Sequence, residues 1–546
     1  MLALRNSPYF SRPVLDAETY FRAASALAAG DGWAEPVYWQ PPGYPYFLAA
    51  VLWLWGPGFL APRLVQAILG ALTAALTCAV GARVFGRGVG FAAGLIVAVY
   101  GLLIYYDGEL LAPSLAICLQ MATLYAAVRA PGEQGGRGWL AAGLLGGLSA
   151  VTNAAFLLVL PVLALAARRR AGWLLVGAAV AVAPVTLRNW TRGGELVLVS
   201  SNAGVNLYLG NNPRYDATVG MRPGRDWQAL LLAPRLHGVS GAAPASRFFA
   251  ARVGAYAARD PGAFVALQAR KLRLLAGGDE IPRNQEIYPA RAWSPVLQVL
   301  LWKAPGLAFP FGLLLPLAVV GLGAAARRAP MLAAPVGALA LGVVAFFVTA
   351  RYRAPLVPLL ALFAAAGVRW AVVEARPRGR VVAVVVGVAV YLVANLGQGP
   401  MPRQMNPDAE HGLAHWLERE GRRAEALDLY RRLARDAAGS FDAWYGVAQL
   451  ATVLGRRDEA DAALARIRDL APAYPDTAVL LARTAVEAGC GPEASAFARR
   501  ALALDPDSDV ARGLLQRADA LRATHPAGRP GGCPARVFVA PYPLES

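Results

Sequence analysis

Charged residues are scarce in this chain of 546 residues: they make up 16% of it, whereas an ordinary soluble domain contains about 25%. Lysine occurs only at Lys271 and Lys303, so arginine carries nearly all of the net charge of +18. Arginines cluster in short loops between apolar runs, as membrane topology requires, which disfavours a nucleic-acid-binding surface. The four cysteines form no metal or redox motif, and the N-terminal segment shows no signal peptide. Because 57% of the residues are hydrophobic, the composition indicates a membrane protein.

Long apolar runs account for this composition. A helix needs roughly 20 apolar residues to cross a hydrocarbon core of ~30 Å. Nine runs approach or reach that length: 60–82, 89–106, 110–128, 153–167, 173–189, 307–325, 331–349, 355–373 and 381–397. A tenth, Gly-rich run at 139–151 is predicted to pack tightly through small residues. The sequence therefore predicts an all-α fold, with a polytopic bundle of about ten spans in 60–189 and 307–397.

Arginines in alternate loops set the predicted topology. They are Arg83, Arg87, Arg129, Arg137, Arg168–Arg170, Arg327, Arg328 and Arg376–Arg380. The positive-inside rule assigns these loops to the cytoplasm. Asp16, Asp107, the long loop 190–306 and the segment 350–355 then fall together on the other side, and residues 1–59 form a first extracytoplasmic loop with interfacial helices. We expect a multi-pass protein of a bacterial inner membrane.

Region 406–523 is more polar and repeats with a period of 34 residues. The period is kept by Gly421, Gly455 and Gly489, by Ala426, Ala460 and Ala494, by Asp408, Asp442 and Asp476, and by Pro472 and Pro506. Glycine at the inter-helix turn, small residues at helix contacts and proline at the repeat end are typical of tetratricopeptide repeats. We predict an α-solenoid on the extracytoplasmic side whose concave face binds a protein partner, and a disordered tail at 524–546.

The polar segment LDAETYFRAASALAAGDGW (15–33) precedes the first long apolar run. It is followed by VYWQPPGYPYFLA (37–49), NAGVNLYLGNNP (202–213), DPGAFVALQARKLRLLAGGDEIPRNQEIY (260–288) and ARYRAPLVPLLALFAAAG (350–367). In this order the segments resemble the C-type (GT-C) membrane glycosyltransferases, in the branch of the protein O-mannosyltransferases and the aminoarabinose transferase. The resemblance covers residues 8–400. The family's first span is missing, which we attribute to a start codon further upstream rather than to loss of the helix.

The resemblance implies a polyprenyl-phosphate sugar as donor and a hydroxyl or amine of an extracytoplasmic protein, lipid or glycan as acceptor. Transfer would be a single displacement that inverts the sugar. A general base must take the acceptor's proton, an effect worth ~10²–10⁴-fold. Asp16 matches the family's first-loop acid and is the predicted base. The competing interpretation is that Asp16 merely caps a helix that begins at Ala17.

Asp107 and Glu109 lie in YYDGELLAP (105–113), between two predicted spans. Charges at that depth are costly unless they face a cavity or a partner. We expect the pair to lie on the acceptor side, with Glu109 positioning the acceptor or a cation, so a divalent cation stays open as a cofactor. The alternative is a solvated turn around Gly108.

Arg351 and Arg353 lie just before Pro355, at the outer end of a predicted span. Guanidinium groups pair bidentately with phosphate and would stabilise the departing lipid phosphate. The alternative is that both snorkel toward lipid headgroups. Lys271 is a weaker candidate for the same phosphate. The remaining candidates for the sugar or acceptor side, for which ordinary polar loop residues are an equal interpretation, are Tyr20, Asn211, Asn212, Glu280 and Asn284.

Two other functional classes compete with an enzyme. A transporter should show related halves with broken helices at matching positions, whereas the long loop 190–306 divides the apolar runs unevenly. A non-catalytic membrane scaffold or assembly protein would act through its repeats alone. The sequence favours the glycosyltransferase over both, with a protein docked on the repeats as a further partner and no nucleic acid.

Overall fold

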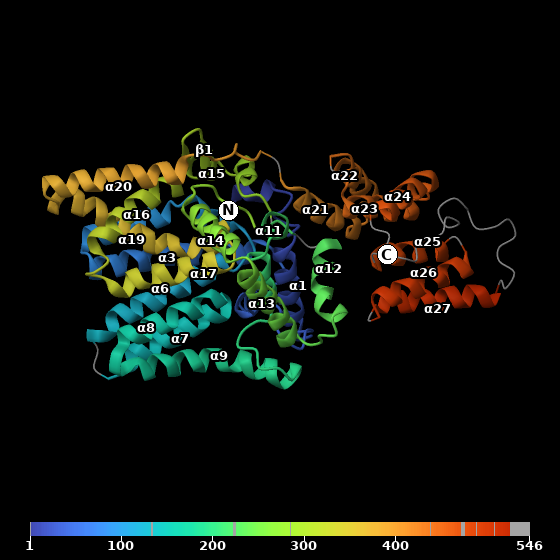
Figure 1. Ribbon diagram of the computed structural model, residues 1–546, viewed down its shortest axis with the longest axis horizontal. Helices are drawn as coiled ribbons and strands as arrows, with labels where there is room; N and C mark the ends of the chain where they lie inside the picture. Colours follow the sequence, from blue (N-terminus) through green and yellow to red (C-terminus); the bar gives the residue numbers. More distant parts are fainter. Residues whose placement is uncertain are drawn as a thin grey trace. The chain divides into compact units, whose positions relative to one another are not determined.

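The computed structural model describes residues 2–524 except 133–134, 222–224, 284, 404, 437, 471–474, 488 and 507. Of the predicted tail, only Thr524 belongs to this part of the chain. The chain divides into two compact units, one made of Met1–Met221 and Leu231–Met405 and the other of Arg222–Leu230 and Asn406–Ser546. Helices dominate both units (Figure 1), as the sequence predicts.

Twenty α-helices precede residue 400 in the described part of the chain. They are α1 (Asp16–Ala29), α2 (Gly43–Trp55), α3 (Leu60–Val84), α4 (Arg87–Ala98), α5 (Gly101–Gly108), α6 (Pro113–Arg129), α7 (Arg137–Thr152), α8 (Val159–Ala167), α9 (Ala171–Gly193), α10 (Ala203–Leu209), α11 (Tyr215–Val219), α12 (Arg225–Leu236), α13 (Ala242–Arg259), α14 (Pro261–Ala276), α15 (Pro295–Leu300), α16 (Phe311–Ala325), α17 (Pro330–Ala345), α18 (Ala350–Arg353), α19 (Val357–Arg369) and α20 (Pro377–Asn395). Short 3-10 turns cover Leu2–Asn6, Ala130–Gly132, Ala154–Leu158, Arg168–Arg170, Tyr288–Trp293 and Ala354–Leu356, and Trp370–Glu374 is π-helical.

Four helical stretches in the described residues are long and apolar enough to cross a membrane: Leu60–Val84, Ala154–Gly193, Ala350–Glu374 and Pro377–Asn395. The pair α4 and α5, bent by 50°, makes a fifth if it is one broken span. The other predicted runs contain α6, α7, α16 and α17, which have 15 to 17 residues. At 1.5 Å per residue such helices are about 25 Å long, shorter than a ~30 Å core. Apolar helices therefore occur where the ten spans are predicted, but these four are shorter than a full span.

Two predicted spans differ from the structure in their boundaries. The runs 153–167 and 173–189 form one helical stretch that changes direction at Arg168, whose φ of 53° is incompatible with a continuous right-handed helix. The run predicted from residue 307 begins instead with a strand. Strands β1 (Trp302–Ala304) and β2 (Leu307–Phe309) form an antiparallel hairpin with Lys303 opposite Ala308, and α16 follows it.

Glycines let the apolar helices of the first unit approach closely. A Cβ atom on Gly143 of α7 would overlap the Leu174 carbonyl oxygen of α9, and one on Gly177 of α9 would overlap the Leu140 carbonyl of α7. This agrees with the tight packing predicted for the run 139–151. In Figure 1, α7 and α9 lie side by side, and α3, α6, α16 and α19 form a neighbouring group.

The segment between α9 and α16, predicted as a long loop, is mostly helical and contains α10 to α15. Together with α1 and α2 it contributes most of the polar side chains described below. Helix α2 exposes Trp53, Leu54 and Trp55 at its C-terminal end, with 73%, 59% and 63% of each residue's surface accessible. This exposure fits the interfacial helix predicted within residues 1–59, because tryptophan favours the membrane–water boundary.

The second unit contains helices that recur at the predicted period. They are α21 (Pro407–Arg419), α22 (Arg423–Asp436), α23 (Phe441–Val453), α24 (Arg457–Leu470), α25 (Pro475–Glu487), α26 (Gly491–Leu504) and α27 (Asp509–Thr524). Gly421, Gly455 and Gly489 follow α21, α23 and α25 with φ of 79°, 71° and 73°, which glycine adopts without strain. Alanines and leucines of successive helices form the core. The unit is therefore a series of paired helices.

Candidate active site

Asp16 and Arg351 form an ion pair although they are 335 positions apart in the chain. Arg351 Nη1 lies 2.6 Å from Asp16 Oδ2, and Nη2 donates a hydrogen bond of 2.9 Å to the Tyr20 hydroxyl. Asp16 is the first residue of α1 and Leu15 occupies the cap position, so Asp16 is not the cap of a helix beginning at Ala17. Leu15 has a φ of 58°, a conformation that costs a non-glycine residue roughly 1–3 kcal/mol.

The second oxygen of the Asp16 carboxylate is held less tightly. Gln40 Nε2 donates to Oδ1 over 3.4 Å, and 25% of the Asp16 side chain is accessible, compared with 11% of Arg351. Burial raises the pKa of Tyr20 to about 12, so this phenol stays neutral at physiological pH. The arrangement is a partly accessible carboxylate with one oxygen paired with a guanidinium and the other hydrogen-bonded to Gln40.

Arg351 also lines a cavity of about 260 Å³. The other side chains of its wall are Tyr105, Tyr106, Leu111, Arg283, Gln285 and Ile287. Arg283 donates to the Met221 carbonyl over 3.3 Å and lies 5.1 Å from the Phe347 ring, which directs it along the wall. Two guanidinium groups at one cavity favour an anionic ligand such as a phosphate.

Arg353 faces a different environment from Arg351. Its Nη2 lies 2.7 Å from Glu280 Oε2 and 2.8 Å from the Asp279 carbonyl oxygen, its Nη1 donates to the Gly277 carbonyl, and its guanidinium lies 3.7 Å from the Phe311 ring. Only 1% of each partner's side chain is accessible. Burial raises the pKa of Glu280, and Arg353 opposes that rise. The pair therefore fastens the turn after α14 to α18 and has no free face for a phosphate.

Lys271 of α14 is likewise buried and fully engaged. Its Nζ donates to Asn211 Oδ1 over 2.7 Å and to the carbonyl oxygens of Gly210 and Phe346 over 3.1 and 3.2 Å. Burial lowers the pKa of Lys271 to about 8. Asn211 in turn donates to the Ala345 carbonyl over 2.7 Å. These bonds join α14, the turn after α10 and the C-terminal end of α17, just upstream of Arg351.

Asn212 has a local role: its Nδ2 donates over 2.8 Å to Thr218 of α11. Asp107 accepts a hydrogen bond of 2.6 Å from the Ser114 hydroxyl. The half-buried Glu109 faces Arg63 and Gln285, and burial raises its pKa to about 7. The turn that carries both acids is thus held by protein groups and is not the solvated turn considered above.

The structure brings together only some of the predicted site residues. Asp16, Tyr20 and Arg351 meet directly, whereas Arg353 with Glu280, and Lys271 with Asn211, form separate buried clusters. Asn284 lies outside the described residues. In the part of the chain that is described, no group of three His, Cys, Asp or Glu side chains could hold a metal ion. Sequence reasoning missed the polar residues of the site that lie in apolar or aromatic surroundings: Gln40, Arg63, Gln66, Arg283 and Gln285.

Two solved structures are similar to this chain at 14% identity each. One is ArnT from Cupriavidus metallidurans bound to undecaprenyl phosphate, with a TM-score of 0.38, covering 96% of this chain and 86% of that one. The other is the archaeal oligosaccharyltransferase AglB from Archaeoglobus fulgidus, in complex with an inhibitory peptide and a dolichol-phosphate, with a TM-score of 0.36. The match covers 74% of this chain but only 54% of AglB, so this chain spans about half of that protein.

No curated protein sequence matches the chain. The four or five apolar helices make it an integral membrane protein with several spans. Residues 39–187, from just before α2 to within α9, match the family described as dolichyl-phosphate-mannose-protein mannosyltransferase.

Proposed function

We propose that this chain is a membrane glycosyltransferase that moves a sugar from a polyprenyl-phosphate donor to an extracytoplasmic acceptor. The observation that carries the proposal is the ion pair between Asp16 and Arg351, next to a cavity that contains a second guanidinium, Arg283. Base and anion-binding groups are what displacement of a phosphate by a hydroxyl or amine requires. The match of residues 39–187 to a mannosyltransferase family supports the same reaction class.

In the proposed reaction, the acceptor oxygen or nitrogen forms a bond to the anomeric carbon while the bond from that carbon to the phosphate oxygen breaks. The Asp16 carboxylate takes the proton of the acceptor. The electron pair of the broken bond leaves with the polyprenyl phosphate, whose charge is stabilised by Arg351 and Arg283. Attack from the side opposite the phosphate inverts the sugar, and the ion pair with Arg351 keeps the carboxylate oriented for each cycle.

Arg353 and Lys271, predicted as phosphate ligands, are reassigned in this proposal to positioning roles. The two Nη groups of Arg353 and the Nζ of Lys271 are bonded to Glu280, Asn211 and main-chain carbonyls. Both residues are buried, and so is Arg353 Nε, which has no hydrogen-bond partner. Lys271 holds the chain at Phe346, which precedes Arg351. Arg353, which follows Arg351, is bonded to residues 277–280. Two buried anchors on either side of Arg351 would set its guanidinium against Asp16.

The second unit supports a docking role. Every second helix begins 34 residues after the last, and α21, α23 and α25 are each followed by a left-handed glycine. This fits tetratricopeptide repeats and a solenoid that binds a protein or presents an acceptor. We place this unit and the Asp16 site on the extracytoplasmic side of a bacterial inner membrane, following the arginine distribution in the loops. The apolar helices would hold the prenyl tail of the donor.

The test is a transfer assay on purified protein in lipid nanodiscs, with a panel of radiolabelled polyprenyl-phosphate sugars and membrane extract as acceptor. Asp16→Asn should lower the rate by ~10²–10⁴-fold, the usual effect of losing a general base. Asp216→Asn is the matched control, because Asp216 is also paired with an arginine, Arg270, but its side chain is 73% accessible. Full activity of Asp16→Asn would overturn the mechanism, and no transfer from any donor would overturn the function.

A further inference from the structure

Arginines gather where helices α7 and α9 begin. Between residues 129 and 173 the sequence contains five arginines, which are Arg129, Arg137 and Arg168–Arg170, and a single acid, Glu133. Residue 133 lies outside the described part of the chain. Even if Glu133 pairs with one arginine, the segment keeps an excess of positive charge. The proposed mechanism uses none of these residues.

The starts of α7 and α9 lie side by side (Figure 1). At the N-terminal ends, a Cβ atom on Gly136 would overlap the ring of Trp173. Further along both helices, a Cβ atom on Gly147 would overlap the Ala178 carbonyl oxygen. The contacts advance in the same direction along both helices, so α7 and α9 run parallel. Arg137, the first residue of α7, is therefore next to the turn of three arginines that precedes α9.

Three of the five arginines are exposed: Arg137, Arg168 and Arg169. Within the described residues, their side chains take part in no hydrogen bond, ion pair or ring contact. Guanidinium groups bind phosphate oxygens bidentately, and several of them at one place favour an anion over a neutral ligand. The three side chains are therefore available to an anionic ligand.

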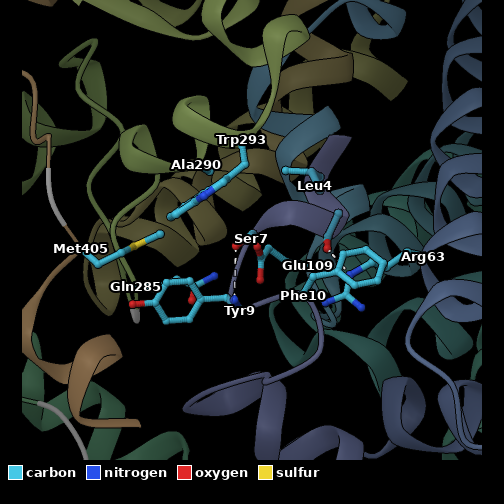
Figure 2. Close-up of a pocket in the computed structure, with 11 residues that line it drawn as sticks. Leu4, Ser7, Tyr9, Phe10, Arg63, Glu109, Gln285, Ala290, Trp293 and Met405 are labelled. Atoms are coloured by element: carbon cyan, nitrogen blue, oxygen red, sulfur yellow. Dashed lines mark hydrogen bonds between the residues drawn. The ribbon is translucent and has the colours of Figure 1, made fainter. Parts of the chain in front are cut away.

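An arginine at the opposite end of the bundle is used differently. Arg63, near the start of α3, is 2% accessible; its Nε donates to the Gly108 carbonyl over 2.6 Å, and its guanidinium lies 4.1 Å from the Phe10 ring (Figure 2). Arg83, near the end of α3, is exposed and lies beside Gly132, shortly before α7. The helix between Arg63 and Arg83 is about 30 Å long, the thickness of a hydrocarbon core. The exposed arginines therefore lie at one boundary of the membrane.

The position of the arginines is electrostatically unfavourable in the protein alone. The N-terminal end of a helix carries partial positive charge, which attracts anions and repels cations. Arg137 begins α7, and Arg170 stands directly before α9, so cations occupy the ends of two adjacent helices where anions are favoured. An anion bound by the exposed guanidiniums would relieve this repulsion.

An apolar surface adjoins the arginines. Leu165 and Trp173, which flank Arg168–Arg170 in the chain, are 81% and 52% exposed. Tryptophan favours the boundary between membrane and water. The stretch Ala154–Gly193 is long and apolar enough to cross a membrane. On its α9 part, three more apolar residues are each more than half exposed: Leu175, Val176 and Val180. A ligand that meets both surfaces has an anionic group and long apolar chains.

We propose that Arg137, Arg168 and Arg169 bind the phosphate headgroup of an anionic phospholipid, whose acyl chains lie on the exposed apolar face of α9. Basic sites between membrane helices bind such headgroups. Arginine-bearing loops attract anionic lipids in general, whereas the parallel pair α7–α9 predicts a site made of these three residues. The proposal does not depend on which reaction the chain catalyses.

The test uses the full chain in detergent with phosphatidylglycerol or phosphatidylcholine added at equal total lipid. Bound lipid is counted by native mass spectrometry, and the thermal midpoint is followed by fluorescence. We expect phosphatidylglycerol to raise the wild-type midpoint by several degrees more than phosphatidylcholine does. The triple variant Arg137→Gln, Arg168→Gln, Arg169→Gln should lose this gain and bind phosphatidylglycerol roughly a hundredfold more weakly, because each arginine near an anionic headgroup contributes about a factor of five.

The same variant in phosphatidylcholine separates loss of binding from misfolding. It should melt at or above the wild-type temperature, because the repulsion at the two helix ends is gone. The matched control is the triple variant Arg376→Gln, Arg378→Gln, Arg380→Gln. It removes the same charge from exposed arginines of another loop on the same predicted side, at the start of α20, and should keep the response to phosphatidylglycerol.

Two outcomes would overturn the site: equal effects of the two lipids on the wild type, or equal losses in the two triple variants, which indicate general surface charge. Inorganic phosphate at millimolar concentration tests the other source of the same anionic chemistry. If it raises the wild-type midpoint as much as phosphatidylglycerol does, the ligand is a free anion and the lipid assignment fails.

Discussion

Replacing Arg353 by leucine distinguishes two possible roles of this residue, a ligand of the donor phosphate and a buried structural anchor. In the structure its guanidinium is buried beside Glu280. Its Nη1 and Nη2 are bonded to Glu280 and to the carbonyls of Gly277 and Asp279, so they are not available to a ligand. Arg353→Leu leaves the Glu280 carboxylate charged or forces it to take up a proton, in a site where 1% of the side chain is accessible. Breaking a buried pair in this way costs about 3–5 kcal/mol.

The corresponding change at Arg351 should behave in the opposite way. Its pair with Asp16 is more accessible, at 11% and 25% of the two side chains, so its loss should cost less stability than loss of the Arg353–Glu280 pair. Arg351→Leu should therefore unfold near the wild-type temperature and lose transfer activity. Arg353→Leu should lower the thermal midpoint by several degrees in a fluorescence melt in detergent.

The double variant Arg353→Leu with Glu280→Leu is the internal control for the buried pair. It should recover part of the lost stability, because the uncompensated carboxylate is gone while the carbonyls of Gly277 and Asp279 still lack their donor. The reasoning is refuted if Arg353→Leu melts like the wild type and raises the donor KM, which is the behaviour of a phosphate ligand.

Two further outcomes follow from the structure. Transfer should fall above about pH 8, where Lys271 loses its proton, because burial lowers its pKa to about 8 and three acceptors depend on its N–H groups. In the Lys271→Arg variant the fall in rate should move to higher pH. A pH–rate profile that does not move would contradict the anchor role. Gly143→Leu should destabilise the first unit by roughly 1–3 kcal/mol, since a side chain there overlaps the Leu174 carbonyl. Gly172→Leu is the control, because a side chain at that position meets open space. Equal melting temperatures for the two variants would refute the close packing.

The helices were predictable because their signals are local. Apolar runs, glycines at 34-residue intervals and the arginine-bearing loops are visible in the sequence, and the helices occur at those positions. Helix length was not predictable in the same way. The runs at α6, α16 and α17 continue into residues outside those helices, such as strand β2 before α16, and hydropathy does not distinguish an apolar turn from an apolar helix.

The candidate site was predictable where topology alone determines it. The arginine-bearing loops predict that Asp16 and Arg351 lie on the same side of the membrane, and in the structure the two side chains meet. The polar partners Arg63 and Gln66 were missed because each is a single polar residue inside a predicted span, where an apolar average hides it. Both side chains donate hydrogen bonds to main-chain carbonyls in the turn at Gly108, more than 40 residues away in the chain. The sequence around Arg63 and Gln66 does not predict these contacts.

The separation of Arg351 from Arg353 follows from helical geometry and was within reach of the sequence. Residues two positions apart on an α-helix point about 200° apart, so side chains at 351 and 353 of α18 cannot face the same ligand. Arg351 turns to Asp16 and the cavity, and Arg353 turns to the buried Glu280. One short helix thus presents one arginine to Asp16 and the cavity, and the other to a buried acid. A pair of arginines spaced in this way at the end of a span is better understood as one ligand and one anchor than as a double phosphate clamp.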